Sequence, residues 1–133
     1  MKIETFTPTT LFKPIGPYSH IAKAGALVAI SGTPGVDPAT GQLAGDDAYS
    51  QTRQLVRNLV VMLESVSCTI ENVLHVHVYL KRVEDFEEMN RAYAEVFHQH
   101  LPARTVICVA DLPKKGALLT MDLQAVCNEG AGQ

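Results

Sequence analysis

The chain has 133 residues, and its 11 lysine and arginine residues against 14 aspartate and glutamate residues give a formal net charge of −3 at pH 7. Only Lys81-Arg82 and Lys114-Lys115 are adjacent basic pairs, so no basic track is available for a nucleic-acid backbone. No apolar segment reaches the roughly 18 to 20 residues that a membrane-spanning helix needs. The sequence therefore predicts one globular domain over residues 1–133, with neither nucleic acid nor membrane as a partner.

The cysteines predict a reducing environment. Cys68, Cys108 and Cys127 are odd in number and lack CxxC spacing, and the N-terminus does not resemble a secretory signal. A chain of this length can bury roughly two-thirds of its unfolded surface, so it needs no disulfide or metal to fold. We expect a cytoplasmic protein with reduced cysteines.

The first half of the chain predicts two strands, a loop and a helix. Residues 20–32 are typical of two strands around a turn at Ala24-Gly25. Prolines and glycines crowd residues 33–42, which indicates a loop. Between Asp46 and Val66, apolar residues recur every three or four positions, which predicts a helix that Asp46 or Asp47 caps. Its wide apolar stripe indicates that this helix lies on a sheet.

The second half predicts a strand, a helix and two more strands. Residues 73–80 alternate, and the two predicted faces consist of Leu74, Val76, Val78 and Leu80 on one side and His75, His77 and Tyr79 on the other. A helical pattern follows from Glu84 to His98, and strands are predicted at 105–110 and 118–126. The order ββαβαββ predicts an α+β sandwich with two helices on one face of a mixed sheet.

The second face of the predicted sheet carries His75, His77 and Tyr79. This face is semi-polar but too poor in charge to be freely solvated, so we expect it to pack against another subunit. The two histidines could begin a metal site. However, the sequence contains no HxxxH, CxxC or acidic cluster to supply a third ligand, and no metal is predicted.

Arg104 stands at the start of an apolar run, Val106 to Ala110, that is typical of a buried strand. It fits two interpretations: a structural ion pair or interface arginine, or a clamp whose planar guanidinium matches the two oxygens of a carboxylate. Cys108, in the same run, is interpreted as a buried small apolar residue rather than a nucleophile. The chain lacks nucleophile-elbow, dinucleotide-binding and P-loop motifs, so neither serine acyl transfer nor nucleotide binding is supported.

Several segments together resemble one protein family. They are GPYSH (16–20), AISGTPGVDPATG (29–41), QTRQLVRNL (51–59), DFEEMNRAYAEVF (85–97) and PARTVICVADLPKKGALL (102–119). Their order, spacing and residue identities are similar to those of the reactive intermediate deaminase family, RidA, formerly called YjgF. The resemblance covers nearly the whole chain, and the combination of PART, LPK, GPYS and SG is specific as a set.

The resemblance implies a chorismate-mutase-like fold and a homotrimer around a central barrel of sheets, with a pocket at each subunit interface. It also implies hydrolysis of enamines and imines, such as 2-aminoacrylate and 2-iminopropanoate, to 2-keto acids and ammonia, with no metal or organic cofactor. A 2-imino acid is already electrophilic at its C=N carbon. Its hydrolysis therefore needs a held carboxylate, a positioned water and a proton path, and no activated nucleophile.

The resemblance also implies roles for individual residues. Arg104 matches the arginine that binds the substrate carboxylate, Tyr18 and Ser31 match pocket-lining positions, and Asn90 matches the asparagine near the interface. Val106 occupies the position of the family's common cysteine in the substrate pocket.

Thr120 departs from the family pattern. Deaminating members usually carry a glutamate here, within a V-E-I-E pattern, where it is thought to orient the attacking water; the second acid survives as Asp122. Threonine can hydrogen-bond a water but cannot accept its proton near neutral pH. From the resemblance we expect an imine deaminase with Arg104 and Thr120 at its catalytic centre. Because Thr120 replaces the glutamate, we expect its substrate to be altered.

The alternative is a trimeric member that binds or senses a keto or amino acid without turning it over. The endoribonuclease activity attached to some relatives would need a basic surface and acid-base pairs, which this sequence does not show.

Overall fold

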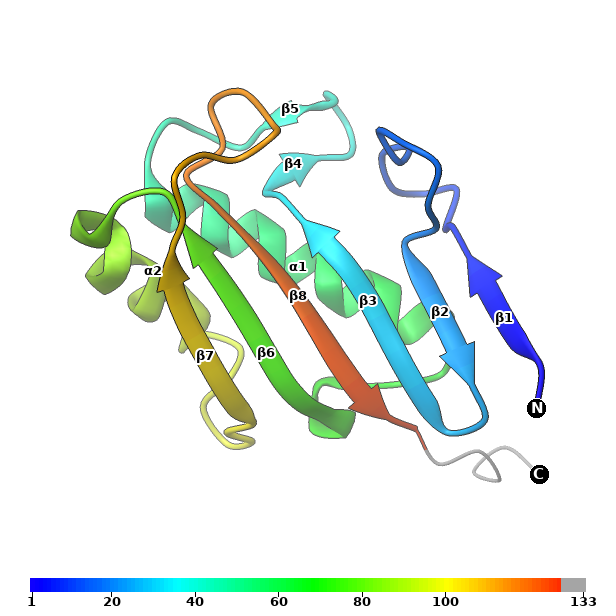
Figure 1. The fold of residues 1–133 in the computed structure, drawn as a ribbon. Coiled ribbons are helices and arrows are strands. Elements are labelled where there is room, and N and C mark those ends of the chain that lie inside the picture. The colour runs from blue at the N-terminus through cyan, green and yellow to red at the C-terminus, as the bar shows by residue number, and fades with distance from the viewer. Residues whose placement is uncertain (128–133) are drawn as a thin grey trace.

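A computed structural model describes residues 1–127, so the expected domain end at residue 133 lies outside the described residues. Six strands form one sheet in the order β1-β2-β3-β8-β6-β7 (Figure 1). Their bounds are β1 (Ile3–Phe6), β2 (Ile21–Ala24), β3 (Leu27–Thr33), β6 (Val73–Leu80), β7 (Ala103–Cys108) and β8 (Leu119–Val126). β6 and β7 pair in parallel and all other neighbours pair antiparallel, so the predicted mixed sheet is confirmed.

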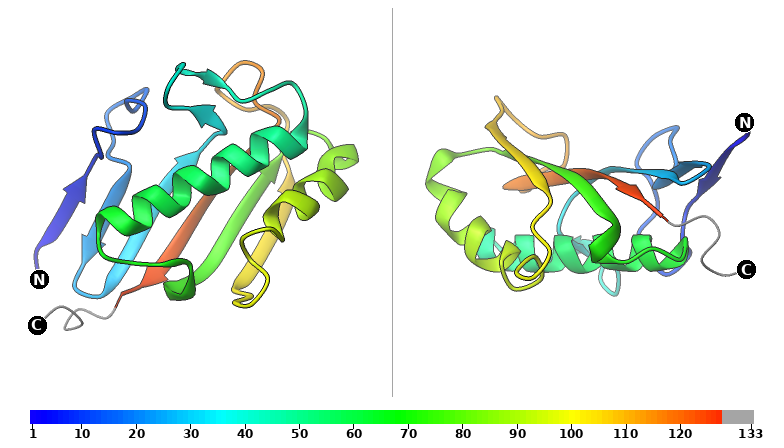
Figure 2. Two further views of the ribbon diagram at one scale, coloured as in Figure 1. Left: turned by 180° about the vertical axis from the view of Figure 1, so that it is seen from behind. Right: turned by 90° about the horizontal axis from the view of Figure 1, so that it is seen from below.

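Both helices, α1 (Ala48–Ser65) and α2 (Phe86–Tyr93), cover the same face of this sheet, as predicted (Figure 2). Asp47 caps α1, because its carboxylate accepts a hydrogen bond from the Ser50 N–H at 3.1 Å. The buried stripe of α1 packs against β3 and β8 and shares one core with inward-facing residues of β6. Short 3₁₀ helices span Ile70–Asn72 and Val83–Asp85. Within residues 1–127 no helix has the length and apolarity needed to cross a membrane.

Three strands and one helix end differ from the sequence prediction. β1 was missed because it is a short, mostly exposed edge strand, and β4 (Val36–Asp37) pairs with β5 (Gln42–Leu43) inside the segment predicted as a loop. The second helix ends at Tyr93 rather than at His98. Phe97 still reaches the core from the following turn, so the apolar spacing overestimated the length of this helix.

The predicted inward face of β6 is wrong at one position. The register shifts between Val73 and His75 where β6 pairs with β8. This bulge leaves Leu74 56% exposed and places Val73 in the core instead. Beyond the bulge, Val76, Val78 and Leu80 are buried as expected.

The expectation of three reduced cysteines is wrong for two of them. Cys68, just before β6, and Cys127, just after β8, form a disulfide with their Cα atoms 5.7 Å apart. Both are buried in the core. Cys108 is free and, contrary to its expected burial, exposed on the edge strand β7.

Thiol titration should therefore separate the two cysteine environments. Protein denatured in guanidinium chloride without reductant is expected to show one reactive thiol per chain, from Cys108, and three after reduction. Detection of three thiols before reduction would contradict the Cys68–Cys127 disulfide.

Gly35 brings the loop after β3 into close contact with α1. A Cβ at this position would lie 2.2 Å from the carbonyl oxygen of Gln51, and backbone atoms cannot move aside cheaply. We expect Gly35→Ala to lower the free energy of unfolding by about 1 to 3 kcal/mol, as overpacking does. Gly32→Ala is the matched control, because its Cβ would meet no atom within 4 Å. Urea denaturation of both variants checks this, and equal stabilities would contradict the close approach.

Candidate functional site

The two faces of the sheet have different surroundings. Alternate residues of β8, such as Leu119 and Met121, are buried in the core beneath the helices. Thr120, between them, is in register with Tyr79 of β6 on the opposite face, which no helix covers. We call this uncovered side the open face.

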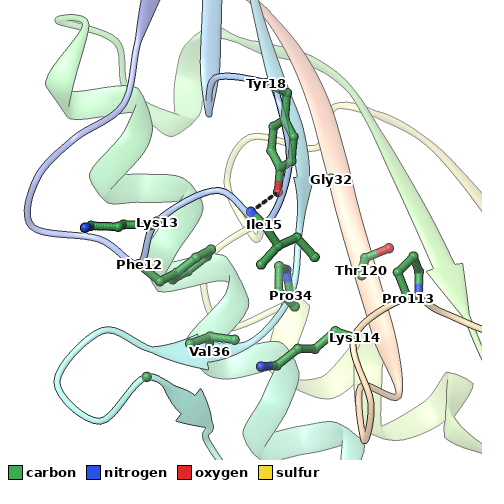
Figure 3. A pocket seen from close by; sticks show the side chains of 11 residues that line it. Phe12, Lys13, Ile15, Tyr18, Gly32, Pro34, Val36, Pro113, Lys114 and Thr120 are labelled. Carbon is green, nitrogen blue, oxygen red and sulfur yellow. Dashed lines mark hydrogen bonds between the residues drawn. The ribbon is translucent and has the colours of Figure 1, made fainter.

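A cavity of about 430 Å³ lies at the end of the sheet where β3 ends and β8 begins (Figure 3). Tyr18 and Thr120, two of the predicted site residues, both line it. The Tyr18 hydroxyl oxygen accepts a hydrogen bond from the Ile15 N–H at 3.4 Å, so its own hydrogen remains free to donate. The remaining lining is largely apolar and consists of Phe12, Lys13, Ile15, Gly32, Pro34, Val36, Gly41, Pro113 and Lys114.

A bulge in β3 shapes one wall of this cavity. The pairing of β3 with β8 shifts between Ile30 and Thr33, so Ser31 and Gly32 lie in the irregular segment. The Ser31 hydroxyl donates to the Ser19 carbonyl at 2.7 Å and thereby ties β3 to the Tyr18 segment. Gly32 lines the cavity and Ser31 does not.

Arg104 and Asn90 line a second recess, of about 320 Å³, between the end of α2 and β7. The Arg104 guanidinium carbon lies 4.8 Å from the ring centroid of Tyr93 and 5.9 Å from that of Phe86. Its Nη1 atom lies 4.0 Å from the sulfur of Met89. Aromatic rings thus hold the cation by cation–π contact and leave most of its N–H donors unused.

No carboxylate within residues 1–127 lies within 4.0 Å of the Arg104 guanidinium. The described part of the chain therefore offers no internal ion pair to explain this arginine, which leaves an interface arginine and a carboxylate clamp as its interpretations. A half-buried guanidinium without an internal anion is well suited to bind an external one.

Tyr93 is a residue of this recess that the sequence analysis did not single out. It is 7% exposed, and its hydroxyl is buried without a hydrogen-bond partner in the described structure. Burial raises the pKa of Tyr93 to about 12, although the nearby Arg104 opposes this shift, so the phenol stays neutral. Its position three residues after Asn90 places both on one side of α2, and this spacing was the signal in the sequence that could have identified it.

Arg104 and Thr120 lie on opposite faces of the same sheet. Arg104 is in register with the buried Val76, on the face that the helices cover, whereas Thr120 pairs with Tyr79 on the open face. Val106 faces the same side as Arg104, packs against the core and lines neither recess. One copy of the chain therefore cannot bring Arg104 and Thr120 to the same small substrate.

The strand that carries Arg104 is less buried than predicted. β7 forms one edge of the sheet, where Ile107 is 48% exposed and Cys108 is also exposed. Its apolar run had indicated a buried strand. The difference arises because nothing within the described residues covers this edge, which leaves it free to meet a second molecule.

The open face carries a polar network rather than a metal cluster. Asp122 accepts hydrogen bonds from His77 Nδ1 and from the Tyr79 hydroxyl, both at 2.8 Å. His75 bonds Thr105 at 3.0 Å and stacks on His77. Among residues 1–127, no three His, Cys, Asp or Glu side chains are grouped closely enough to hold a metal ion.

Comparisons with known proteins identify the family of the chain. Residues 9–127 match the family model described as Endoribonuclease L-PSP. A RutC family protein of Pyrococcus horikoshii is 44% identical over 102 residues, which make up 77% of this chain and 81% of the relative. The chain belongs to the RidA/YjgF family. The resemblance seen in the sequence is thus confirmed.

Two further RidA/YjgF relatives bear on the site. A protein of Capra hircus named 2-iminobutanoate/2-iminopropanoate deaminase is 34% identical over 116 residues, 87% of this chain and 82% of the relative. The crystal structure of Escherichia coli TdcF with bound serine matches with a TM-score of 0.87 and 26% identity, covering 94% of this chain and 99% of that one. The predicted YjgF-like α+β fold is confirmed.

Proposed function

We propose that this RidA/YjgF protein is a homotrimeric hydrolase of 2-imino acids whose site is built from two copies of the chain. One copy supplies Arg104 and Asn90 from the β7 edge, and its neighbour supplies the cavity of Tyr18, Gly32 and Thr120. The observation that carries this proposal is the unpaired Arg104 guanidinium, which lies on the opposite sheet face from Thr120. Ser31 acts indirectly, by fixing the bulge next to Gly32.

The proposed hydrolysis needs the protein only to bind the substrate carboxylate and to orient the water and the substrate. Arg104 binds the carboxylate of the imino acid, and water adds to the C=N carbon to form a C–O bond. One proton of that water moves to nitrogen on addition. The remaining hydroxyl proton then moves to nitrogen as the C–N bond breaks and the C=O bond forms, so that a 2-keto acid and ammonia are released. The hydroxyls of Tyr18 and Thr120 orient the water and the substrate by hydrogen bonds.

Asp122 does not take over the role of the family glutamate in this proposal. Both of its oxygens are engaged, one by His77 and the other by Tyr79. A carboxylate held in this way positions its neighbours on the open face, and Asp122 does not line the cavity where the water would attack. Water placement therefore depends on Thr120.

The open face supports the trimer. Large apolar residues are exposed on it, namely Leu27, Ile107 and Val126, around the His77–Asp122–Tyr79 network. Exposed apolar residues at both ends of a sheet face, with satisfied polar groups between them, are typical of a surface buried by association. Closure of three such faces into a barrel would place each β7 edge beside a neighbouring copy.

Light scattering after size exclusion should give three times the 14.5 kDa chain mass at micromolar protein. The apolar open face is the physical reason to expect association. A monomer mass at that concentration would contradict both the trimer and the composite site.

Imine hydrolysis can be tested directly. An amino-acid oxidase generates 2-iminopropanoate or longer imines in situ, and loss of the imine is followed with and without this protein. We expect the protein to accelerate the loss of at least one imine. The deaminase named among the relatives and the serine bound to TdcF support a small carboxylate-bearing substrate.

A second function is favoured by Thr120 alone. A trimer without a general base at this position could bind or sense a keto or amino acid without turnover. Calorimetric binding of pyruvate together with no acceleration of imine loss for any substrate would select this function over hydrolysis.

A further inference from the structure

The cavity of Tyr18 and Thr120 is positively charged. Two lysines, Lys13 and Lys114, line it, and its described lining contains no aspartate or glutamate. Figure 3 shows that Lys114 extends from its loop across the cavity towards Val36, whereas Lys13 points away from it. No carboxylate within residues 1–127 lies within 4.0 Å of the Lys114 amine.

The loop that carries Lys114 is firmly anchored. The buried side chain of Gln51 donates to the carbonyl of Gly116 at 3.1 Å and accepts from the Leu118 N–H at 2.8 Å. The Lys114 carbonyl itself accepts from Ala117 at 3.0 Å. These bonds fix the backbone from which the half-buried Lys114 side chain reaches into the cavity.

The half-buried Lys114 ammonium has no carboxylate partner within residues 1–127 and lies beside apolar walls. An anionic ligand group would pair with this charge, and the apolar lining from Phe12, Ile15 and Pro34 would strengthen the attraction. Thr120 leaves such an anion unopposed, whereas a glutamate at this position would repel it.

We propose that the cavity selects 2-imino acids whose side chain ends in a second carboxylate, and that Lys114 binds this distal carboxylate. The inference rests on the proposed function for the location of the imine, beside Thr120. The hydrolysis is unchanged, and Arg104 of the neighbouring copy holds the carboxylate next to the imine carbon. Lys114 is then a specificity-determining residue.

Stable keto acids test this selection without catalysis. 2-Oxoglutarate and 2-oxopentanoate have the same five-carbon chain, but only the first carries a distal carboxylate. By calorimetry, wild-type protein is expected to bind 2-oxoglutarate about 10- to 150-fold more tightly, the range of one charge-assisted contact. Lys114→Met should abolish this preference and leave the affinity for 2-oxopentanoate nearly unchanged.

The adjacent lysine supplies a matched control. Lys115 does not line the cavity, so Lys115→Met should keep the preference for 2-oxoglutarate. Lys114→Gln, which keeps a polar side chain without the charge, should lose the preference in the same way as Lys114→Met. Equal affinity of the wild type for the two acids, or an intact preference in both Lys114 variants, would overturn the proposal.

The imine assay separates this inference from the proposed function. Hydrolysis of 2-iminopropanoate without a binding preference for 2-oxoglutarate would overturn the role of Lys114 and leave imine hydrolysis in place. A clear binding preference that depends on Lys114, with no turnover of any imine, would support the selection and overturn the hydrolysis.

Discussion

Thr120→Glu is expected to raise turnover of 2-iminopropanoate by roughly 10² to 10⁴, the usual contribution of a general acid-base group. The introduced carboxylate would project from β8 into the cavity, where it could accept the proton of the attacking water. Pyruvate affinity should change little, because Arg104 holds the carboxylate from another element. The measurement compares imine loss for wild type and variant in one assay, with calorimetric pyruvate affinity for both.

Thr120→Glu should have a second effect, which depends on Lys114. The two side chains line the same cavity, so the introduced carboxylate should pair with the lysine and weaken the preference for 2-oxoglutarate. Thr120→Gln is the control that adds length without a base and should give no gain in turnover. An equal gain in both variants would show that side-chain size, and not proton transfer, limits the wild type.

Arg104→Ala is expected to weaken binding of pyruvate by about 10- to 150-fold, which corresponds to one charge-assisted contact of about 1.5 to 3 kcal/mol. For so small a ligand this is most of the available binding energy. Arg104→Lys should recover only part, because a point charge lacks the planar fork that engages both carboxylate oxygens. Calorimetry on the three proteins gives the comparison.

The control for Arg104 is another arginine outside the recess. Arg57→Ala, on the exposed side of α1, should leave pyruvate affinity unchanged. Tyr93→Phe should also bind normally, because it keeps the ring that contacts the guanidinium, whereas Tyr93→Leu should weaken binding. Equal affinity of wild type and Arg104→Ala would refute the carboxylate clamp.

The parts of the fold that the sequence predicted are those with a periodic apolar pattern. Helix α1 and strand β6 bury every third or fourth residue and every second residue respectively, so local spacing reports their burial. β1 is short and largely exposed, and β4 and β5 have only two residues each, so neither carries such a signal. The bulge at Leu74 could not be predicted from the local sequence because it depends on how β6 pairs with β8.

The site could be predicted only in part for a related reason. Family motifs pointed to Arg104, Tyr18 and Thr120, but their separation onto two sheet faces depends on strand register. Lys114 reaches the cavity because Gln51, 63 positions earlier in the sequence, anchors its loop through bonds to Gly116 and Leu118. No local pattern encodes such a contact, and the same holds for the Cys68–Cys127 disulfide, whose partners are 59 positions apart.

Subunit mixing tests the composite site most directly. Gly32→Leu should fill the cavity without disturbing its own chain, because no atom lies within 4 Å of an added Cβ at this position. Homotrimers of Arg104→Ala and of Gly32→Leu are each expected to be inactive towards imines, with trimer formation verified by light scattering. Unfolding and refolding the two variants together in equal amounts should restore about a quarter of the wild-type rate of imine loss, because that fraction of interfaces joins an intact arginine to an intact cavity. A mixed preparation no faster than the two variants kept apart would contradict a site shared between neighbouring copies.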